Sequence, residues 1–260
     1  MMSEIHGEIR DGSGWIVINR PEKRNAVTLE MWDEMRRVLA HFIKKNVRSI
    51  VITGISGHFA AGADLTEFAV TKASPEEARR SFLAVDNVCR AIYEAPMPII
   101  AAIEGYAIGA GLELAVACDI RLATTTVKIG ITASKLGITI GYRHIRRLVS
   151  VIGPAHAIDL LTSARLLSAN DAYRMGLVTE VAEDGEALGA LVDRWVDRYA
   201  RRAPLSLAWA KEAVHQVVED PGMHEIQDDA GQSIRCFETH DFREAIRAFR
   251  ERRVPEFTGQ

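Results

Sequence analysis

Cysteine is scarce in this sequence, and the few cysteines present are widely separated. Cys89, Cys118 and Cys236 are the only three among 260 residues. They do not have the short spacing of a metal-binding motif. An odd and sparse set favours free, mostly buried thiols in a reducing compartment, and we expect no metal centre. None has a base beside it in a recognisable motif, so a catalytic thiol is not expected.

Long hydrophobic runs are missing as well. No stretch of about 18 apolar residues occurs, which argues against a membrane-spanning helix. The first residues, MMSEIHGEIRDGSG, contain neither an apolar segment nor a basic amphipathic stretch. No signal or transit peptide is therefore expected. We predict a cytoplasmic protein, or one of an organelle matrix if a presequence was already removed.

Charge of one sign is not in excess. Lys and Arg number 32 and Asp and Glu number 35, which gives a net charge of −3. Basic residues alternate with acidic ones and form no basic stripe, so nucleic-acid binding ranks last among the functions considered. Hydrophobic residues make up 48% of the chain, which is enough for a sizeable core. The length fits one large domain, or one domain with a small appendage.

Strands and helices alternate in the first part of the chain. Short apolar or β-branched segments predict strands at residues 15–19, 47–53, 98–103 and 120–123. Helices are predicted at residues 29–42, 75–94 and 110–118, the first two beginning after Thr28 and Ser74 as N-caps. Residues 105–109 are expected to form a loop. This order indicates an α/β fold with successive β units.

The last part of the chain has a different character. Amphipathic patterns predict helices at residues 187–201, 204–218, 223–237 and 242–252. The last helix carries Ile246 and Phe249 on a face opposite charged residues. Such a face packs on the domain or on a neighbouring subunit. We place the core at residues 1–196 and a helical oligomerisation region at residues 197–260.

Two glycine-containing segments follow predicted strands, at residues 57–65 (GHFAAGADL) and 105–115 (GYAIGAGLELA). Their small residues leave backbone N–H groups uncovered, and the second segment leads into a helix N-terminus, where anions bind favourably. One amide from each segment could hold a developing oxyanion. A phosphate loop or close helix packing are alternatives, although the third glycine of a dinucleotide fingerprint is missing.

A series of motifs, taken together, is more specific than either loop. Their order is NRPEKRNA at residues 19–26, FAAGADL at 59–65, PIIAA at 98–102, GYAIGAGLELA at 105–115 and CDI at 118–120. With ANDAYRMGLVTEV at 169–181 and the C-terminal segment, they resemble the crotonase superfamily, also called the enoyl-CoA hydratase/isomerase family. The resemblance implies a spiral of ββα units and a helical region that builds homotrimers or dimers of trimers.

The resemblance also implies roles for particular residues. Ala63 and Ala110 correspond to the two residues whose amides hold the thioester oxygen of an acyl-CoA as it becomes an enolate. Residues at coenzyme A positions are Arg24, Ala26 and Ala61, together with Phe249 and Arg252, which would reach the coenzyme from an adjacent subunit. Arg24 taken alone also fits a solvated surface charge. Coenzyme A is part of the substrate, so no separate cofactor is expected.

The sequence departs from the hydratase members of this family at one carboxylate. Hydration suits two acid/base groups, because water loses a proton while Cα gains one. Glu113 corresponds to the first of them; without the resemblance it would be a first-turn glutamate stabilised by its helix. The second falls, without a gap, on Ala133, which cannot transfer a proton.

A second departure replaces glycines that border the reacting end of the substrate in the family. The segment reads IGYRH at residues 140–144. Tyr142, Arg143 and His144 are candidates for a replacement polar group, and His144 can move protons near neutral pH. We favour another interpretation, in which Arg143, Arg146 and Arg147 cover a surface helix and His144 only packs there. Asp64 could face the pocket but is more typical of a loop support.

Several functions stay open at this point. The first is an enoyl-CoA hydratase/isomerase-type enzyme that uses Glu113 beside the oxyanion site. Within the family, a double-bond isomerase needs only one proton carrier, and a decarboxylase relies mostly on the oxyanion site. A hydrolase of the same family is a further alternative. A catalytically inactive acyl-CoA-binding protein is the alternative from a different class, because Ala133 and the substitutions at residues 142–144 remove expected features.

Overall fold

The computed structural model describes residues 3–67, 74–224 and 230–260. Its strands are β1 (Ile5–Arg10), β2 (Ser13–Ile18), β3 (Ile50–Gly54), β4 (Ile99–Ile103), β5 (Tyr106–Ile108), β6 (Ile120–Thr124), β7 (Lys128–Gly130) and β8 (Glu180–Ala182). Its helices are η1 (Pro21–Lys23), α1 (Leu29–Lys44), α3 (Pro75–Glu94), α4 (Ala110–Ala117), η2 (Ala133–Leu136), α5 (Tyr142–Ser163), α6 (Ala169–Arg174), α7 (Gly185–Ala200), α8 (Pro204–Glu219), α9 (Gly231–Glu238) and α10 (His240–Glu251).

A six-stranded sheet forms the centre, in the order β1-β2-β3-β4-β6-β8. The β1–β2 pair is antiparallel, and the other neighbours are parallel. A small parallel pair, β5–β7, lies beside it. This confirms the α/β prediction and its four strands, although β3 begins three residues later than expected. β1, β7 and β8 were not predicted, and β5 lies within the segment expected to be a loop.

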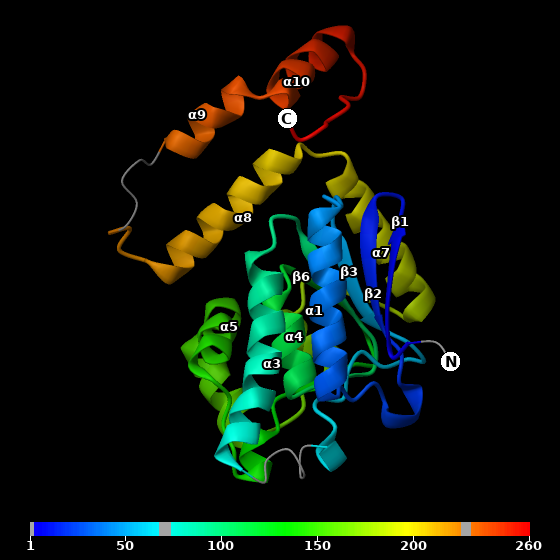
Figure 1. Cartoon of the computed structure of the whole chain (residues 1–260), viewed down its shortest axis with the longest axis vertical. Coiled ribbons are helices and arrows are strands. Elements are labelled where there is room, and N and C mark those ends of the chain that lie inside the picture. Colours follow the sequence, from blue (N-terminus) through cyan, green and yellow to red (C-terminus); the bar gives the residue numbers. More distant parts are fainter. Residues whose placement is uncertain (1–2, 68–73, 225–229) are drawn as a thin grey trace.

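Alternate residues of the central strands point into two cores. Ile50 and Ile52 of β3 join the larger core, which also contains apolar residues of α1, α3, α4 and α5. Val51, between them, joins the smaller core, where Leu188 and Leu191 of α7 cover the opposite face. Because side chains of a strand alternate between faces, an apolar run such as β3 must be covered on both sides. Figure 1 shows α1 and α3 on one side of the sheet and α7 on the other.

Local signals place the helices that matter for the site. The Thr28 side chain accepts a hydrogen bond from the Met31 N–H, and Ser74 accepts one from the Glu77 N–H. Both are N-caps that satisfy free helix donors, and both confirm the sequence prediction. The predicted helix at 110–118 is confirmed as α4, which is buried almost throughout.

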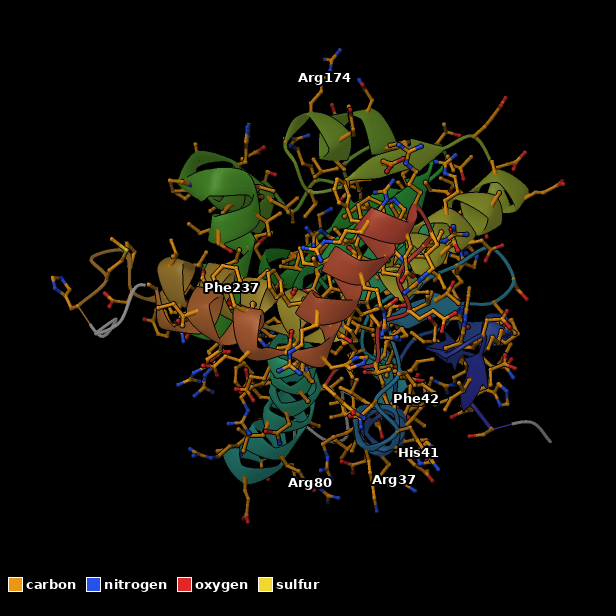
Figure 2. The ribbon with its side chains drawn as sticks, turned by 90° about the horizontal axis from the view of Figure 1, so that it is seen from above. Arg37, His41, Phe42, Arg80, Arg174 and Phe237 are labelled. Carbon is orange, nitrogen blue, oxygen red and sulfur yellow. The ribbon has the colours of Figure 1, made fainter. Side chains whose placement is uncertain are left out.

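The C-terminal helices extend away from the sheet. In Figure 1, α8, α9 and α10 lie at the end opposite the N-termini of α1 and α3. Figure 2 looks down on that end and shows α10 lying across the molecule, with Phe237 of α9 beside it. The prediction that a helix begins at residue 223 is wrong, because Met223 has a φ of 52° and α9 begins at Gly231; residues 225–229 of that prediction lie outside the described residues.

The expected boundary between the core and the helical oligomerisation region, at residue 196, falls inside α7, whose buried residues pack on the sheet. The division into these two regions stays a prediction. The three cysteines are free, with Cys89 and Cys118 buried, as expected. Within the described residues, no helix is long and apolar enough to cross a membrane.

Candidate active site

A cavity of about 780 Å³ lies between the N-terminal ends of several elements. Its walls come from the segments before and at the start of α1, the loop around Ala63, α3, the start of α4, and residues 131–140. Most of the lining is apolar, as in sites that enclose an organic ligand. In the described chain, four lining residues have ionisable side chains, namely Asp64, Glu67, Glu113 and Lys135.

The two glycine-containing segments meet along one wall of this cavity. The Ala60 N–H donates to the Tyr106 carbonyl at 2.8 Å, and the Ile108 N–H donates back to the Ala60 carbonyl at 3.1 Å. A Cβ atom at Gly111 would lie 2.3 Å from the Ala60 carbonyl oxygen. Only glycine permits this approach, because a Cβ atom cannot come that close to a backbone oxygen. The small residues of both segments therefore bring two backbones together.

Ala63 and Ala110 both line the cavity, at neighbouring points of the two segments. A Cβ atom on Gly62, the residue before Ala63, would lie 4.0 Å from the Ala110 nitrogen. Ala110 is the first residue of α4, where helix N–H groups have no partner within the helix. Among described residues, neither amide donates a backbone hydrogen bond. Two uncommitted N–H groups thus border the same space.

Glu113 stands in the first turn of α4 and lines the same cavity. Its backbone N–H donates to the Gly109 carbonyl at 3.0 Å, so the helix start fixes the backbone position of Glu113. Burial, and then the nearby Asp86 carboxylate, raise the pKa of Glu113 to about 7, while Arg147 opposes the rise. A carboxyl group with this pKa can both take and return a proton at neutral pH.

Behind Glu113 lies a buried imidazole between two carboxyl groups. His144 of α5 has its Nδ1 atom 3.2 Å from Glu113 Oε2, and its Nε2 atom 3.8 Å from Asp86 Oδ1. Asp86 comes from α3, and its other oxygen accepts a hydrogen bond from Arg143 at 2.8 Å. Both imidazole nitrogens and Asp86 Oδ1 have no aligned hydrogen-bond partner among the described residues. His144 does not line the cavity.

The favoured interpretation of the basic helix is wrong for Arg147, whereas His144 is buried by packing as that interpretation expected, although it lies beside a carboxyl group. Arg143 and Arg146 are exposed, but His144 is 3% exposed and Arg147 is 4% exposed. The guanidinium of Arg147 lies 5.0 Å from the centre of the Tyr93 ring. α5 turns this side toward α3 and α4, so His144 and Arg147 face the buried carboxyl groups. Burial, and then Arg147, lower the pKa of His144 to about 4, so its imidazole is neutral at pH 7.

Other predicted pocket residues divide into two groups. Ala133 lines the cavity, where its methyl group offers no proton. Tyr142 is 91% exposed and does not line the cavity, so the prediction that it faces the pocket is wrong. It is the first residue of α5, two positions before the buried His144.

Asp64 lines the cavity, but its carboxylate accepts hydrogen bonds from neighbouring protein groups. Arg20 donates to it at 2.6 Å, and the Thr66 N–H donates to it at 2.8 Å. The hydrogen bond from Arg20 holds the pKa of Asp64 at about 2. This carboxylate stays ionised and supports the loop, which was the alternative we considered more typical.

The predicted coenzyme A residues lie in two distant places. Arg24, Ala26 and Ala61 are close together, since the Ala61 N–H donates to the Arg24 carbonyl at 3.1 Å, and Ala61 lines the cavity. Arg24 has a φ of 50° and lies over the Tyr106 ring. Phe249 and Arg252 lie on and after α10, at the opposite end of the chain fold (Figure 1).

Asp86 was not among the residues considered from the sequence. Its signal was available, because it interrupts an apolar stripe of α3 that continues through Val88, Cys89 and Ile92 on the buried side. A buried carboxylate on such a face needs a partner. No group of three or more His, Cys, Asp or Glu residues that could hold a metal ion occurs in the described part of the chain.

Comparisons with known proteins agree with this fold and identify the family. The family model described as enoyl-CoA hydratase/isomerase matches residues 8–260. A Bacillus subtilis protein named as a probable enoyl-CoA hydratase is 36% identical over 223 residues, covering 82% of this chain and 83% of its own. Human mitochondrial methylglutaconyl-CoA hydratase is 33% identical over 248 residues, covering 94% of this chain and 73% of its own.

Solved structures give the same result. The crystal structure of an enoyl-CoA hydratase from Bacillus anthracis superposes with a TM-score of 0.93 at 28% identity, over 99% of this chain and 100% of the other. The α/β fold and these similarities define the crotonase class of enzymes. The chain belongs to the enoyl-CoA hydratase/isomerase family. It is accordingly an enzyme of that family that acts on an acyl-CoA thioester.

Proposed function

We propose that this enzyme moves a proton along the acyl chain of a CoA thioester, with Glu113 as its single acid/base group. The thioester oxygen would lie between the amides of Ala63 and Ala110. The observation that carries the proposal is the pairing of Glu113, whose pKa is about 7, with Ala133 in the same cavity. Glu113 can carry a proton in this cavity, whereas the alanine at position 133 cannot.

A 1,3 double-bond shift needs only one such group. The Glu113 carboxylate takes a proton from Cα of a 3-enoyl thioester, and the electron pair passes to the carbonyl oxygen to give a dienolate. The two amides stabilise that oxyanion, and losing one such donor typically costs about 10²–10³ in rate. Protonated Glu113 then returns the proton to Cγ. The product is a 2-enoyl thioester, and the carboxylate is restored.

Hydration of a 2-enoyl-CoA is the second candidate. It is favoured by the names of the relatives, which include probable enoyl-CoA hydratase and methylglutaconyl-CoA hydratase. With one carboxylate, this reaction would lose a factor of about 10²–10⁴ that the second acid/base group supplies. We therefore rank isomerisation first and hydration second.

The experiment compares 3-enoyl-CoA and 2-enoyl-CoA substrates of several chain lengths, with wild type and Glu113→Gln. Glu113→Gln should lower kcat for isomerisation about 10²–10⁴-fold, because the amide cannot accept the proton. Glu186→Gln, in the exposed first turn of α7, is the matched control and should behave as wild type. An active Glu113→Gln enzyme, or acyl-CoA binding without turnover across the whole panel, would contradict the proposal.

A second variant separates the two candidate reactions. Ala133→Glu places a carboxyl group at the cavity wall where the family's second acid/base residue stands. It should raise the ratio of hydration to isomerisation, measured on the same batch of substrate. An unchanged ratio in a folded Ala133→Glu protein would mean that something other than the missing carboxylate decides the reaction.

The coenzyme and the assembly complete the proposal. Arg24, Ala26 and Ala61 would contact the coenzyme A of the same subunit, and Phe249 and Arg252 that of a neighbour in a homotrimer or a dimer of trimers. Supporting this, the Ala61 N–H donates to the Arg24 carbonyl, and Ala61 lines the cavity. By contrast, α10 lies at the other end of its own chain (Figure 1).

A further inference from the structure

The buried groups behind Glu113 form a chain that the reaction described above does not use. Glu113, His144 and Asp86 come from α4, α5 and α3, and consecutive members are 3.2 Å and 3.8 Å apart. We infer that Asp86 and His144 are a positioning pair, which holds the Glu113 carboxyl group toward the cavity and decides when it carries a proton. The inference rests on the proposed role of Glu113.

A neutral imidazole has one N–H group, and here two carboxyl groups face its two nitrogens. While Glu113 is protonated, its O–H can donate to Nδ1, and the imidazole proton is free to stay on Nε2, toward Asp86. When Glu113 ionises, its carboxylate needs the proton on Nδ1, and Asp86 then faces a bare nitrogen. The two carboxylates therefore compete for one proton. This competition favours protonated Glu113 beyond the effect of burial alone.

The surrounding charges are consistent with this arrangement. Asp86 and Cys89 face the cluster from α3, and Arg143 and Arg147 face it from α5. Arg143 binds one oxygen of Asp86, which leaves Oδ1 for the imidazole. Burial raises the pKa of the Cys89 thiol, so it adds no charge near pH 7. Arg147 is a buried cation that disfavours protonation of His144 and keeps the imidazole neutral.

The pair acts through Glu113 and does not touch the substrate, because neither His144 nor Asp86 lines the cavity. Hydrogen bonds of this kind are often long or poorly aligned in an unliganded enzyme, as the 3.8 Å contact is here. The imidazole ring is packed edge-on against Phe82, with ring centres 6.1 Å apart. Packing thus fixes the ring while its proton can reside on either nitrogen.

The test is an infrared titration of the Glu113 carboxyl group, identified as the carbonyl band that is missing in Glu113→Gln. Asp86→Asn should lower the titration midpoint by about one pH unit, because an amide can donate to Nε2 and send the imidazole proton to Glu113. His144→Phe should raise the midpoint, because the Glu113 anion loses a donor. Hydrogen bonds to an ionised group are stronger than those to a neutral one, so losing His144 destabilises ionised Glu113 more than protonated Glu113.

The decisive measurement is the double variant. If the imidazole mediates between the two carboxyl groups, Asp86→Asn should shift the midpoint clearly less when His144 is already replaced by Phe. His144→Gln provides a second background with a polar side chain, in case the Phe variant folds poorly. If Asp86→Asn shifts the Glu113 midpoint equally with and without His144, Asp86 acts on Glu113 only as a charge through space. That result would overturn the inference.

Controls and activity readouts keep this test separate from the proposed reaction. His156→Gln, on the exposed side of α5, should leave the midpoint unchanged. The titration needs no turnover, so it remains valid even if no enoyl thioester is isomerised. Where turnover is observed, the pH at which kcat/KM falls on the acidic side should shift with the Glu113 midpoint of each variant, while KM stays constant. Simple loss of folding would not produce this pattern.

Discussion

Glu113, the acid/base group of the proposed reaction, lines the cavity in an environment that is unfavourable for its own charge. Its pKa is raised from 4.5 to about 7, first by burial and then by Asp86. Between these two pH values the folded protein binds a proton that the unfolded chain has released. The free energy of unfolding therefore falls as the pH rises through this window. The raised pKa that suits Glu113 to the proposed proton transfer therefore also lowers the stability of the fold above pH 7.

This gives a prediction at the residue scale. From pH 5 to pH 8, wild type should lose on the order of 2 to 3 kcal/mol of unfolding free energy that Glu113→Gln does not lose. Urea denaturation of both proteins at the two pH values measures the difference. The variant should be the more stable protein at pH 8, and the gap should narrow toward pH 5. A gap that does not depend on pH would show that Glu113 titrates normally.

The same pKa predicts the pH dependence of activity. A base with a pKa of about 7 must be ionised to take the Cα proton. Accordingly kcat/KM should fall about tenfold for each pH unit below 7 and level off above it. Asp64, whose pKa is about 2, stays ionised throughout this range and should not contribute. Initial rates from pH 5 to pH 9 on the best substrate of the panel test this, and a flat profile would contradict it.

At the scale of elements, the site depends on how closely α4 approaches the loop before Ala63. Gly111, in the first turn of α4 and next to Ala110, lies against the Ala60 carbonyl. The hydrogen bonds between Ala60 and the β5 segment hold the same two backbones together. Any side chain at residue 111 must push α4 away, and with it the Ala110 amide and the Glu113 carboxyl group.

Gly111→Ala should therefore lower both stability and activity. Overpacking of this kind typically costs about 1–3 kcal/mol, and kcat should fall because the two amides separate. Gly189→Ala is the matched control, since nothing lies within 4 Å of a Cβ atom at that position of α7. It should be neutral or stabilise the protein by up to about 1 kcal/mol, because alanine favours a helix. Thermal melts and kcat of both variants test the comparison, which fails if they behave alike.

At the scale of the whole molecule, the C-terminal helices leave an apolar surface uncovered in a single chain. Phe249 of α10 is 83% exposed, and Phe237, Phe242 and Ile246 are also exposed. Large exposed apolar patches usually mark an interface. In the proposed homotrimer or dimer of trimers, a neighbouring subunit would cover α10, and Phe249 would reach that subunit's coenzyme.

Phe249→Asp should therefore weaken self-association and raise KM for acyl-CoA, because a charge would be buried at the interface. Sedimentation velocity measures the first effect and steady-state kinetics the second. Tyr173→Asp is the control, because Tyr173 is an exposed aromatic residue of α6 and the adjacent Arg174 lies away from α10 in Figure 2. An assembly and KM unchanged by Phe249→Asp would overturn this role of α10.

The sequence by itself determined the features that depend on neighbours along the chain. Thr28 and Ser74 cap their helices, and apolar runs such as 50–53 become strands covered on both faces. The ordered motifs identified the family, and the prediction that Ala133 replaces its second carboxylate comes from the same alignment of motifs. These features are local or follow a fixed spacing, so they can be recognised without knowing which elements pack together.

Only the tertiary structure decided what surrounds Glu113. Asp86, Glu113 and His144 stand on three different helices, and no pattern within any one helix predicts that the three side chains meet. The sequence suggested a basic surface helix at residues 143–147, but packing of α5 against α3 and α4 turns His144 and Arg147 inward. Burial in that contact raises the pKa of Glu113 and lowers that of His144. These effects depend on distances in space, and no spacing along the chain encodes them.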